Sequence, residues 1–414
     1  MDQVQIEMAL DKNYLVPDEI QKAYLMVKLT APELVGTKRP KQNLSFVIDH
    51  SGSMHGDKLD RTKKAVAFAV GHLGKEDLCS VIAFDDEISV VVPQHRLEAK
   101  DVLKRQIQAI CSGGTTNLSG GMLTGFKEVK KAFHETQINR ILLLTDGMAN
   151  VGITNPQALV KKAEEIAQSG VQVSTFGLGE DFEEDLLQQM AEAGKGNFYY
   201  IETPDQIPAI FEQELTSLLS IVAQNLVLTI KPSEEVRVTG ILGYPSTDES
   251  NHQVMMPDLY SGETKALLLE LSIAPLSKGY HPLFSVDVEY TDVRESLEMV
   301  RLTAGFGANC DSEGTMTLEN QEVMKQVQLY KVADAKEEAI KRADRGDYEG
   351  SRQVLEESIN ALNPLAYETN DQELQAEIME LNASLQFMSE EGYDKTLRKK
   401  MSSQAYQQRR GRRK

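Results

Sequence analysis

The chain has 414 residues, of which 26% are charged and 41% hydrophobic, and its net charge at pH 7 is −19. This length is enough for about two to four domains, and the negative charge argues against broad nucleic-acid binding by the folded body. No stretch approaches the ~18 uninterrupted apolar residues of a membrane span, and the first residues lack the basic and apolar regions of a signal peptide. We therefore expect a globular protein in the cytoplasm, with no membrane partner.

Alternating apolar and polar residues mark the beginning of the chain and a later segment. Residues 4–10 and 23–30 show this alternation, which is typical of half-buried antiparallel strands. It recurs within residues 224–231, 235–242, 265–273 and 284–290. Because two strands are too few to be stable alone in water, we predict one β-sandwich that is built from residues 1–36 and 221–306.

Between these two pieces, residues 40–220 alternate strand-like and helix-like patterns, which predicts a parallel sheet covered on both faces. The strand candidates are 44–49, 78–84, 88–92, 140–145, 171–176 and 197–201. The helix candidates are 57–73, 98–110, 118–133, 156–168, 183–193 and 204–219. Only three residues, 85–87, separate the second strand from the third, so we expect that pair to form an antiparallel hairpin at the sheet edge. A strand order of 3-2-1-4-5-6 would make the first and fourth strands neighbours.

The last part of the chain has a helical pattern. Residues 316–345, 347–363 and 370–390 carry apolar side chains at three- and four-residue spacing, with a break expected at Asn363 and Pro364. We predict a helical region over residues 316–403. A basic tail over residues 404–414, which ends in arginines and a lysine, is expected to be disordered.

Oxygen-bearing side chains follow two of the buried strands and fill a glycine-rich loop between them. In an extended backbone Asp49, Ser51 and Ser53 point to the same side. Thr116 lies in the loop 112–118, and Asp146 directly follows the strand 140–145. No cysteine or histidine belongs to this pattern. Such an all-oxygen set suits Mg²⁺ or Mn²⁺ and fits zinc or copper poorly.

These three motifs, in this order, resemble the von Willebrand factor A domain with its metal-ion-dependent adhesion site. The resemblance covers about residues 40–220 and implies a Rossmann-like, doubly wound α/β domain, here inserted into the β-sandwich and followed by the helical region. Alignment on the helix that follows the loop favours Thr116 over Thr115 as the metal-binding threonine. The implied metal site consists of the hydroxyls of Ser51, Ser53 and Thr116, with Asp49 and Asp146 holding the ion directly or through water.

The function that this resemblance implies is a non-enzymatic protein-interaction module. A Mg²⁺ ion, or alternatively Mn²⁺ or Ca²⁺, would bind an Asp or Glu carboxylate of a protein partner. One alternative is an adaptor that couples a AAA+ ATPase to a client. Another is a Mg²⁺-dependent phosphotransfer enzyme, although the haloacid-dehalogenase pattern needs Asp-x-Asp and Ser51 occupies the second acidic position. The partner and the oligomeric state are left open.

Overall fold

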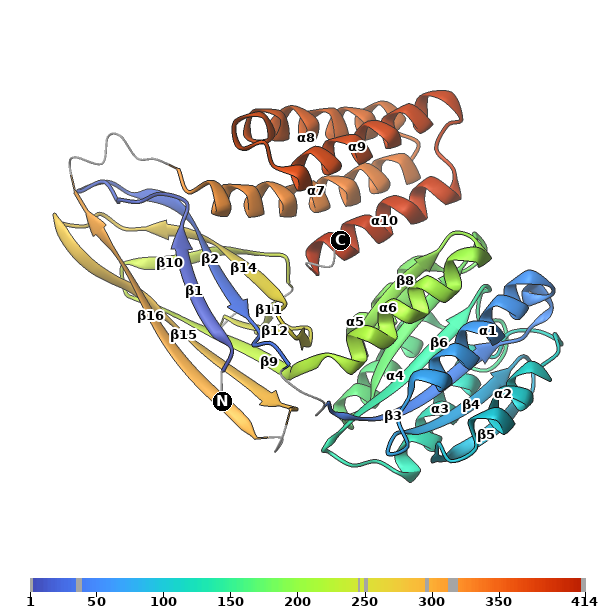
Figure 1. The fold of residues 1–414 in the computed structure, drawn as a ribbon. Coiled ribbons are helices and arrows are strands. Elements are labelled where there is room, and N and C mark those ends of the chain that lie inside the picture. The colour runs from blue at the N-terminus through green and yellow to red at the C-terminus, as the bar shows by residue number, and fades with distance from the viewer. Residues whose placement is uncertain are drawn as a thin grey trace. The chain divides into compact units, whose positions relative to one another are not determined.

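The computed structural model describes residues 3–34, 39–244, 246–248, 252–294, 298–311 and 319–410. The chain divides into two compact units (Figure 1). One unit consists of Met1–Val35, Val222–Asp292 and Glu298–Lys414, and the other of Gly36–Ile221 and Val293–Leu297. The second unit contains the predicted oxygen cluster.

The second unit is built on a mixed sheet with the strand order β5-β4-β3-β6-β7-β8. Its strands are β3 (Lys41–Asp49), β4 (Leu78–Phe84), β5 (Ile88–Arg96), β6 (Gln137–Thr145), β7 (Gln172–Leu178) and β8 (Lys195–Ile201). β3 pairs in parallel with β4 and β6, whereas β4 and β5 are antiparallel. The predicted strand order and the antiparallel edge are therefore confirmed, and the carboxyl ends of β3 and β6 lie side by side.

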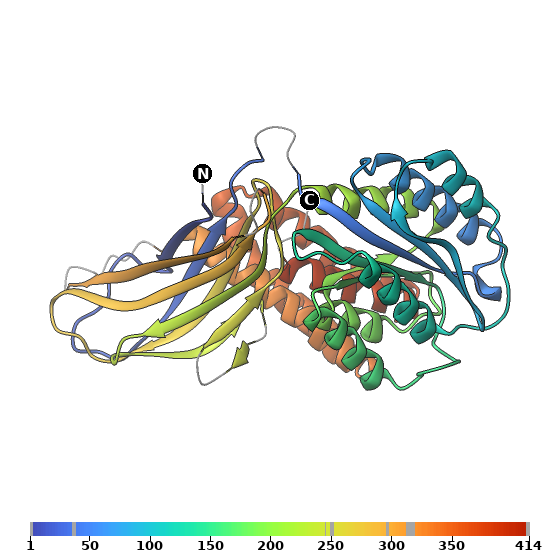
Figure 2. The same cartoon turned by 90° about the horizontal axis from the view of Figure 1, so that it is seen from below.

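Helices cover both faces of this sheet (Figure 2). They are α1 (Asp57–His72), α2 (Lys100–Gln108), α3 (Leu118–Lys131), α4 (Pro156–Gln168), α5 (Glu184–Ala193) and α6 (Ile207–Leu219). Two short 3₁₀ turns, η1 (Gly52–Met54) and η2 (Pro204–Gln206), precede α1 and α6. α3 approaches the sheet so closely that a Cβ atom at Gly121 would lie 2.6 Å from Phe84, and one at Gly125 would lie 2.6 Å from Val47. The two glycines thus allow α3, which follows the glycine-rich loop, to pack closely against β3 and β4.

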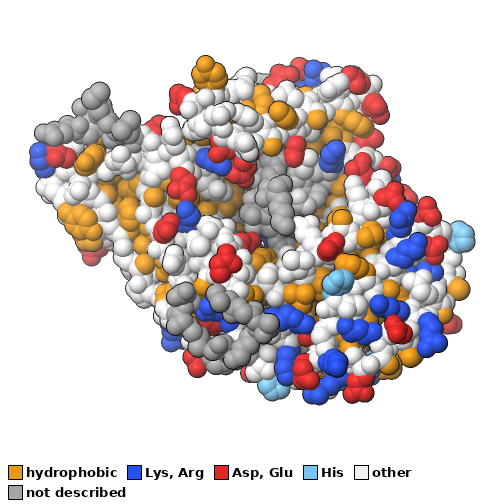
Figure 3. Space-filling model, in the orientation of Figure 1, with side chains coloured by type: hydrophobic (Ala, Val, Ile, Leu, Met, Phe, Trp, Pro, Cys, Tyr) orange, Lys and Arg blue, Asp and Glu red, His pale blue; other side chains and the backbone are white. Residues whose placement is uncertain are grey.

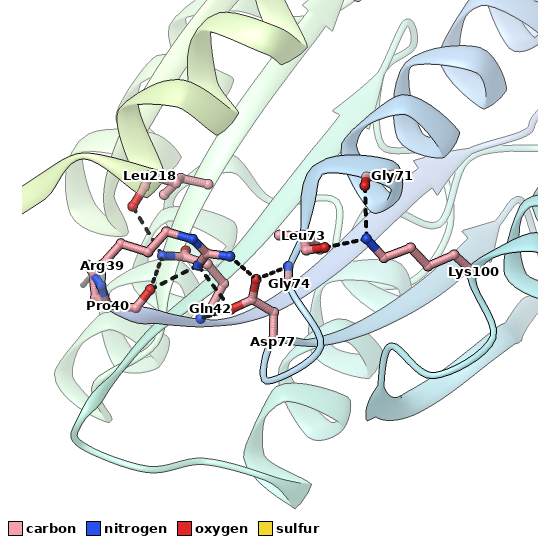
Figure 4. A network of polar contacts seen from close by, with 9 residues as sticks. All are labelled: Arg39, Pro40, Gln42, Gly71, Leu73, Gly74, Asp77, Lys100 and Leu218. Carbon is pink, nitrogen blue, oxygen red and sulfur yellow. Dashed lines mark hydrogen bonds and ion pairs between the residues drawn. The ribbon is translucent and has the colours of Figure 1, made fainter. Parts of the chain in front are cut away.

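Polar contacts hold the opposite, amino-terminal end of β3 (Figure 4). The guanidinium of Arg39 donates to Asp77 Oδ1 at 3.1 Å, and the same oxygen accepts a bond from the backbone N–H of Gln42 at 2.9 Å. The Gln42 side chain donates to the backbone oxygen of Leu218 at 3.1 Å. β3 is therefore tied to the loop before β4 and to the end of α6.

A buried polar network fastens α6 to the sheet. Glu214 Oε1 accepts hydrogen bonds from Arg140 Nη1 at 3.1 Å and from Ser174 Oγ at 2.7 Å. Its other oxygen accepts from Asn197 Nδ2 at 2.8 Å and from the Tyr199 hydroxyl at 2.7 Å. The side chains of Arg140 and Glu214 are 1% and 0% exposed, so the removal of either one breaks a buried ion pair.

The first unit contains the β-sandwich. One sheet has the order β1-β2-β14-β10, and the other has β11-β12-β9-β15-β16 with β13 paired to β9. The strands are β1 (Gln5–Leu10), β2 (Gln21–Thr30), β9 (Ile221–Pro232), β10 (Val236–Leu242), β11 (Ser246–Asp248), β12 (Gln253–Met256), β13 (Leu259–Tyr260), β14 (Thr264–Ile273), β15 (Gly279–Asp292) and β16 (Met299–Cys310). β2 pairs with β14 along its whole length, from Gln21 opposite Ile273 to Thr30 opposite Thr264. The predicted fold class is confirmed, while the exact domain limits stay a prediction.

The helical region consists of α7 (Gln321–Asp344), α8 (Tyr348–Thr369), α9 (Gln372–Glu390) and α10 (Lys395–Arg409). α7 packs Val323, Val327 and Tyr330 against Met26 and Leu268 of the sandwich. The contact is also polar, since the Tyr330 hydroxyl donates to the backbone oxygen of Ala266 at 2.6 Å.

Two expectations about this region were wrong. α8 continues through Pro364, because Leu362 and Ala366 on either side of it are buried in the helical core. The expected disorder from residue 404 onward does not hold for residues 404–409, because α10 buries Tyr406 and Arg409 pairs with Asp334 at 2.6 Å. Residues 411–414 of the predicted tail lie outside the described residues.

The surface gives two further observations. None of the helices in the described part of the chain has the length and apolar character needed to span a bilayer. On the face drawn in Figure 3, basic side chains are interspersed with acidic ones.

The Glu214 network leads to a stability prediction. Replacing Glu214 with Ala should lower the free energy of unfolding of this unit by about 3–5 kcal/mol, because it breaks a buried ion pair and removes the hydrogen-bond acceptor of Ser174, Asn197 and Tyr199. Glu212 lies on the exposed side of the same helix, so Glu212→Ala should cost less than about 0.5 kcal/mol. Urea denaturation followed by circular dichroism measures both variants. Equal losses in the two variants would contradict the assigned role.

Candidate functional site

The site begins with two buried carboxylates at neighbouring strand ends. Asp49 is the last residue of β3, Asp146 directly follows β6, and both are fully buried. Asp49 Oδ1 accepts a hydrogen bond from the Ser51 backbone N–H at 2.8 Å, and its Oδ2 accepts one from Thr145 Oγ1 at 2.5 Å. Both oxygens of Asp49 are therefore held in place by the backbone turn and by β6.

The serine hydroxyls lie over these carboxylates. Ser53 Oγ donates to Asp146 Oδ1 at 2.7 Å, and Ser51 Oγ lies 3.2 Å from Ser53 Oγ. Ser53 is exposed, so this cluster opens to solvent. Because the Ser53 hydroxyl hydrogen is directed at Asp146, the lone pairs of that oxygen remain available to a cation.

Thr116 completes the cluster from the glycine-rich loop. Its side chain is buried, whereas Thr115 is exposed and is engaged through its backbone N–H with Asp86. A Cβ atom at Gly147 would lie 3.3 Å from Thr116 Oγ1 and 3.7 Å from Ser53 Oγ. The missing side chain at position 147 thus leaves a small space that hydroxyls from two loops border. All five residues of the predicted site meet here.

The acidic hairpin turn between β4 and β5 shapes the glycine-rich loop, a role that sequence reasoning missed. Asp85 Oδ2 accepts a hydrogen bond from the Gly114 N–H at 2.8 Å, and the Asp85 backbone oxygen accepts from Asn117 at 2.8 Å. A Cβ atom at Gly113 would collide with this carboxylate. Partial burial acts to raise the pKa of Asp85, but backbone hydrogen bonds and the nearby His50 lower it below its ordinary value. A charged Asp85 therefore holds the loop.

Asn150 is a second residue that the sequence did not reveal. Asn150 Oδ1 accepts a hydrogen bond from the Thr116 backbone N–H at 2.8 Å. The Asn150 backbone N–H donates to the Thr116 backbone oxygen at 3.1 Å. This reciprocal pair joins the loop after β6 to the threonine. The only hint in the sequence is an asparagine shortly after Asp146.

Lys58 is the third site residue that the sequence did not reveal. Its ammonium lies 2.6 Å from Asp146 Oδ2, and the lysine side chain is 28% exposed while the aspartate is 0% exposed. A cationic group therefore already lies against one of the two carboxylates. A lysine in the first turn of a predicted helix was the available signal.

The residues present fit a hard divalent cation. Within the described ranges, no group of three or more His, Cys, Asp or Glu side chains could hold a metal, so an ion here depends on hydroxyl oxygens. The Nδ1 atoms of the neighbouring histidines are directed to other groups: His50 Nδ1 lies 2.8 Å from the Cys111 oxygen, and His55 Nδ1 lies 3.0 Å from Ser112 Oγ. The all-oxygen donor set and the Lys58 ammonium on Asp146 both fit a site for a hard divalent cation.

The buried Asp49 generates a pH prediction for the metal-free protein. Burial raises the pKa of Asp49 to about 6 from its ordinary 3.8, with hydrogen bonds from Ser51 and Thr145 opposing it and Asp146 adding to it. The folded state therefore holds this proton more tightly than the unfolded chain does. The stability that this group contributes is fully present below pH 3.8 and is lost as the pH rises through about 6.

In the Asp49→Asn variant this loss should be absent. From pH 4 to pH 7 in EDTA, the free energy of unfolding of the variant relative to the wild type should rise by about 2.4 kcal/mol. Urea denaturation at the two pH values measures the difference. A difference that stays constant with pH would refute the assignment.

Residues 43–213 match the family model of the von Willebrand factor type A domain. The uncharacterized protein YfbK of Escherichia coli is 28% identical over 261 residues, which cover 61% of this chain and 45% of YfbK. The uncharacterized protein sll0103 of Synechocystis is 27% identical over 266 residues, which cover 62% of this chain and 63% of sll0103. The chain thus spans only about half to two thirds of these curated relatives.

Inter-alpha-trypsin inhibitor heavy chain H3 of Homo sapiens is 28% identical over 195 residues, which cover 43% of this chain and 22% of that protein. Two solved structures resemble nearly the whole chain. A von Willebrand factor type A protein from Catenulispora acidiphila has a TM-score of 0.71 at 16% identity, covering 90% of this chain and 89% of its own. The ArnB paralog VWA2 from Sulfolobus acidocaldarius has a TM-score of 0.62 at 18% identity, covering 99% and 98%. These two likenesses show the fold.

Proposed function

Because residues 43–213 form a von Willebrand factor type A domain, a family that commonly mediates protein–protein interaction, we propose that this chain is a metal-dependent interaction module. A Mg²⁺ ion is held by Ser51, Ser53 and Thr116, with Asp49 and Asp146 behind them. An Asp or Glu carboxylate of a protein partner binds at this site. The proposal includes no catalytic step.

The pairing of hydroxyls with buried carboxylates carries this proposal. Asp49 is held by the Ser51 N–H and by Thr145, and Asp146 receives the Ser53 hydroxyl. The two aspartates supply the negative charge that balances a divalent ion, while the exposed Ser53 presents oxygen lone pairs outward. When bound, Mg²⁺ supplies an electrophilic position that a carboxylate can occupy in place of water.

A carboxylate suits this site better than a neutral group does. Binding removes water from the metal face, and a partner group of opposite charge offsets that desolvation cost more effectively than a neutral one. Protein interactions of this kind need access from solvent, which the exposed residues Ser53, Gly113 and Gly114 provide.

An enzymatic role has less support. In the described part of the chain, neither His50 nor His55 is hydrogen-bonded to Ser51 or Ser53, since their Nδ1 atoms contact the Cys111 oxygen and Ser112 Oγ. The second carboxylate that phosphoaspartate chemistry would need after Asp49 is replaced by Ser51.

The cytoplasmic location that we expect from the sequence stays a prediction.

Adjacent threonines provide a matched test of the metal site. Thr116→Ala removes a hydroxyl from the cluster and should weaken Mn²⁺ binding by about tenfold or more, while the fold is kept. Thr115→Ala removes an exposed hydroxyl next to it and should leave the affinity unchanged. Calorimetric titration of the full chain with Mn²⁺ measures both. Unchanged affinity in Thr116→Ala would argue against the assigned ligand set.

Partner binding should depend on the same residue. The full chain used as bait should retain its partner in Mg²⁺ and release it in EDTA, because the partner carboxylate needs the ion. The Thr116→Ala bait should retain little of it, and the Thr115→Ala bait should behave as the wild type. Equal retention in Mg²⁺ and in EDTA would mean that the partner binds another surface.

A further inference from the structure

Lys58 belongs to the oxygen cluster although it cannot ligate a cation. Its Nζ lies 2.6 Å from Asp146 Oδ2, while the other oxygen of this carboxylate, Oδ1, accepts the Ser53 hydroxyl at 2.7 Å. Both oxygens of the buried aspartate are therefore engaged. A metal that took Asp146 Oδ2 directly would have to displace the ammonium.

Lys58 lies in the first turn of α1, between Asp57 and Asp60. The positive end of the helix dipole disfavours a cation in this turn, whereas these two acidic side chains favour one. The ammonium contacts the buried Asp146 at 2.6 Å.

The end of β7 lies near the ammonium. Gly179 follows β7 with a φ of 76°, and a Cβ atom there would lie 3.7 Å from Lys58 Nζ, which is an ordinary contact distance. The lysine therefore links the start of α1 to the end of β6, beside the end of β7. With 28% of its side chain exposed, it also faces the solvent from which a partner approaches.

We propose that Lys58 sets the charge selectivity of this site: it weakens the binding of the metal ion and strengthens the binding of an anionic partner group. This inference rests on the proposed function, because it concerns the same site. Asp49 and Asp146 together carry two negative charges, which a divalent ion alone would neutralise. The ammonium of Lys58 adds one positive charge, so the two aspartates, the ion and Lys58 together carry a net charge of one positive unit.

Two consequences of opposite sign follow from this charge. The ammonium competes with the ion for Asp146 and repels it, so the loss of Lys58 should tighten metal binding. The same ammonium attracts a carboxylate that approaches the loaded site, so its loss should weaken anion binding. A lysine with a merely structural role would not produce this pair of effects, since loosening the site would weaken both.

The test uses the full chain, Mn²⁺ as the metal and acetate as the carboxylate probe. Lys58→Met should bind Mn²⁺ about tenfold more tightly by calorimetry and, once loaded, acetate about tenfold more weakly by water proton relaxation. Lys64→Met removes an equal charge from an exposed position of the same helix and should change neither value. Thermal melting by circular dichroism checks that each variant is folded.

The outcomes separate this inference from the proposed function. Mn²⁺ binding by the wild type, with tighter binding of Mn²⁺ and weaker binding of acetate by Lys58→Met, supports both. If the wild type binds Mn²⁺ and Lys58→Met binds it equally or less tightly, the role of Lys58 is overturned while the metal site stands. If acetate affinity is unchanged in Lys58→Met, the selectivity role is likewise overturned. If neither protein binds Mn²⁺, both proposals fail.

Discussion

The burial of two carboxylates at adjacent strand ends is the constraint on which the site depends. Asp49 and Asp146 are fully buried, and a charged carboxylate in such a place needs hydrogen bonds or a cation. Backbone N–H groups, hydroxyls and the Lys58 ammonium meet part of that need. The raised pKa of Asp49 shows that burial outweighs its hydrogen bonds, so bound positive charge would stabilise its ionised form.

The rest of this unit keeps these groups in register. Pairing of β3 with both β4 and β6 fixes the relative height of the strand ends. The Asp85 turn and Asn150 hold the glycine-rich loop from two sides, so that Thr116 rather than Thr115 enters the cluster. The Glu214 network anchors α6 to the same sheet at a distance from the cluster.

Local patterns made much of the fold predictable. The short acidic turn after β4 allowed only a hairpin, and strand–helix alternation led to the observed strand order. Burial that depends on distant contacts was not predictable from the sequence. α8 runs through Pro364 because the residues on either side of it pack in the helical core. The basic segment after residue 403 is helical because Tyr406 is buried in α10.

The same limit applies to the site. Its oxygen donors were visible because each one follows a recognisable strand or loop. Lys58 and Asn150 were not, since a lysine in the first turn of a helix is typical of a solvated surface and an asparagine after a strand is typical of a turn. Only folding brings these two residues to Asp146 and Thr116.

Anomalous diffraction from crystals of the full chain grown with Mn²⁺ would test the central claim most directly. The account predicts one manganese peak in contact with the hydroxyl oxygens of Ser51, Ser53 and Thr116, with Asp49 and Asp146 directly behind or beside it. A fully ordered site without a manganese peak, or a peak only elsewhere on the chain, would contradict it.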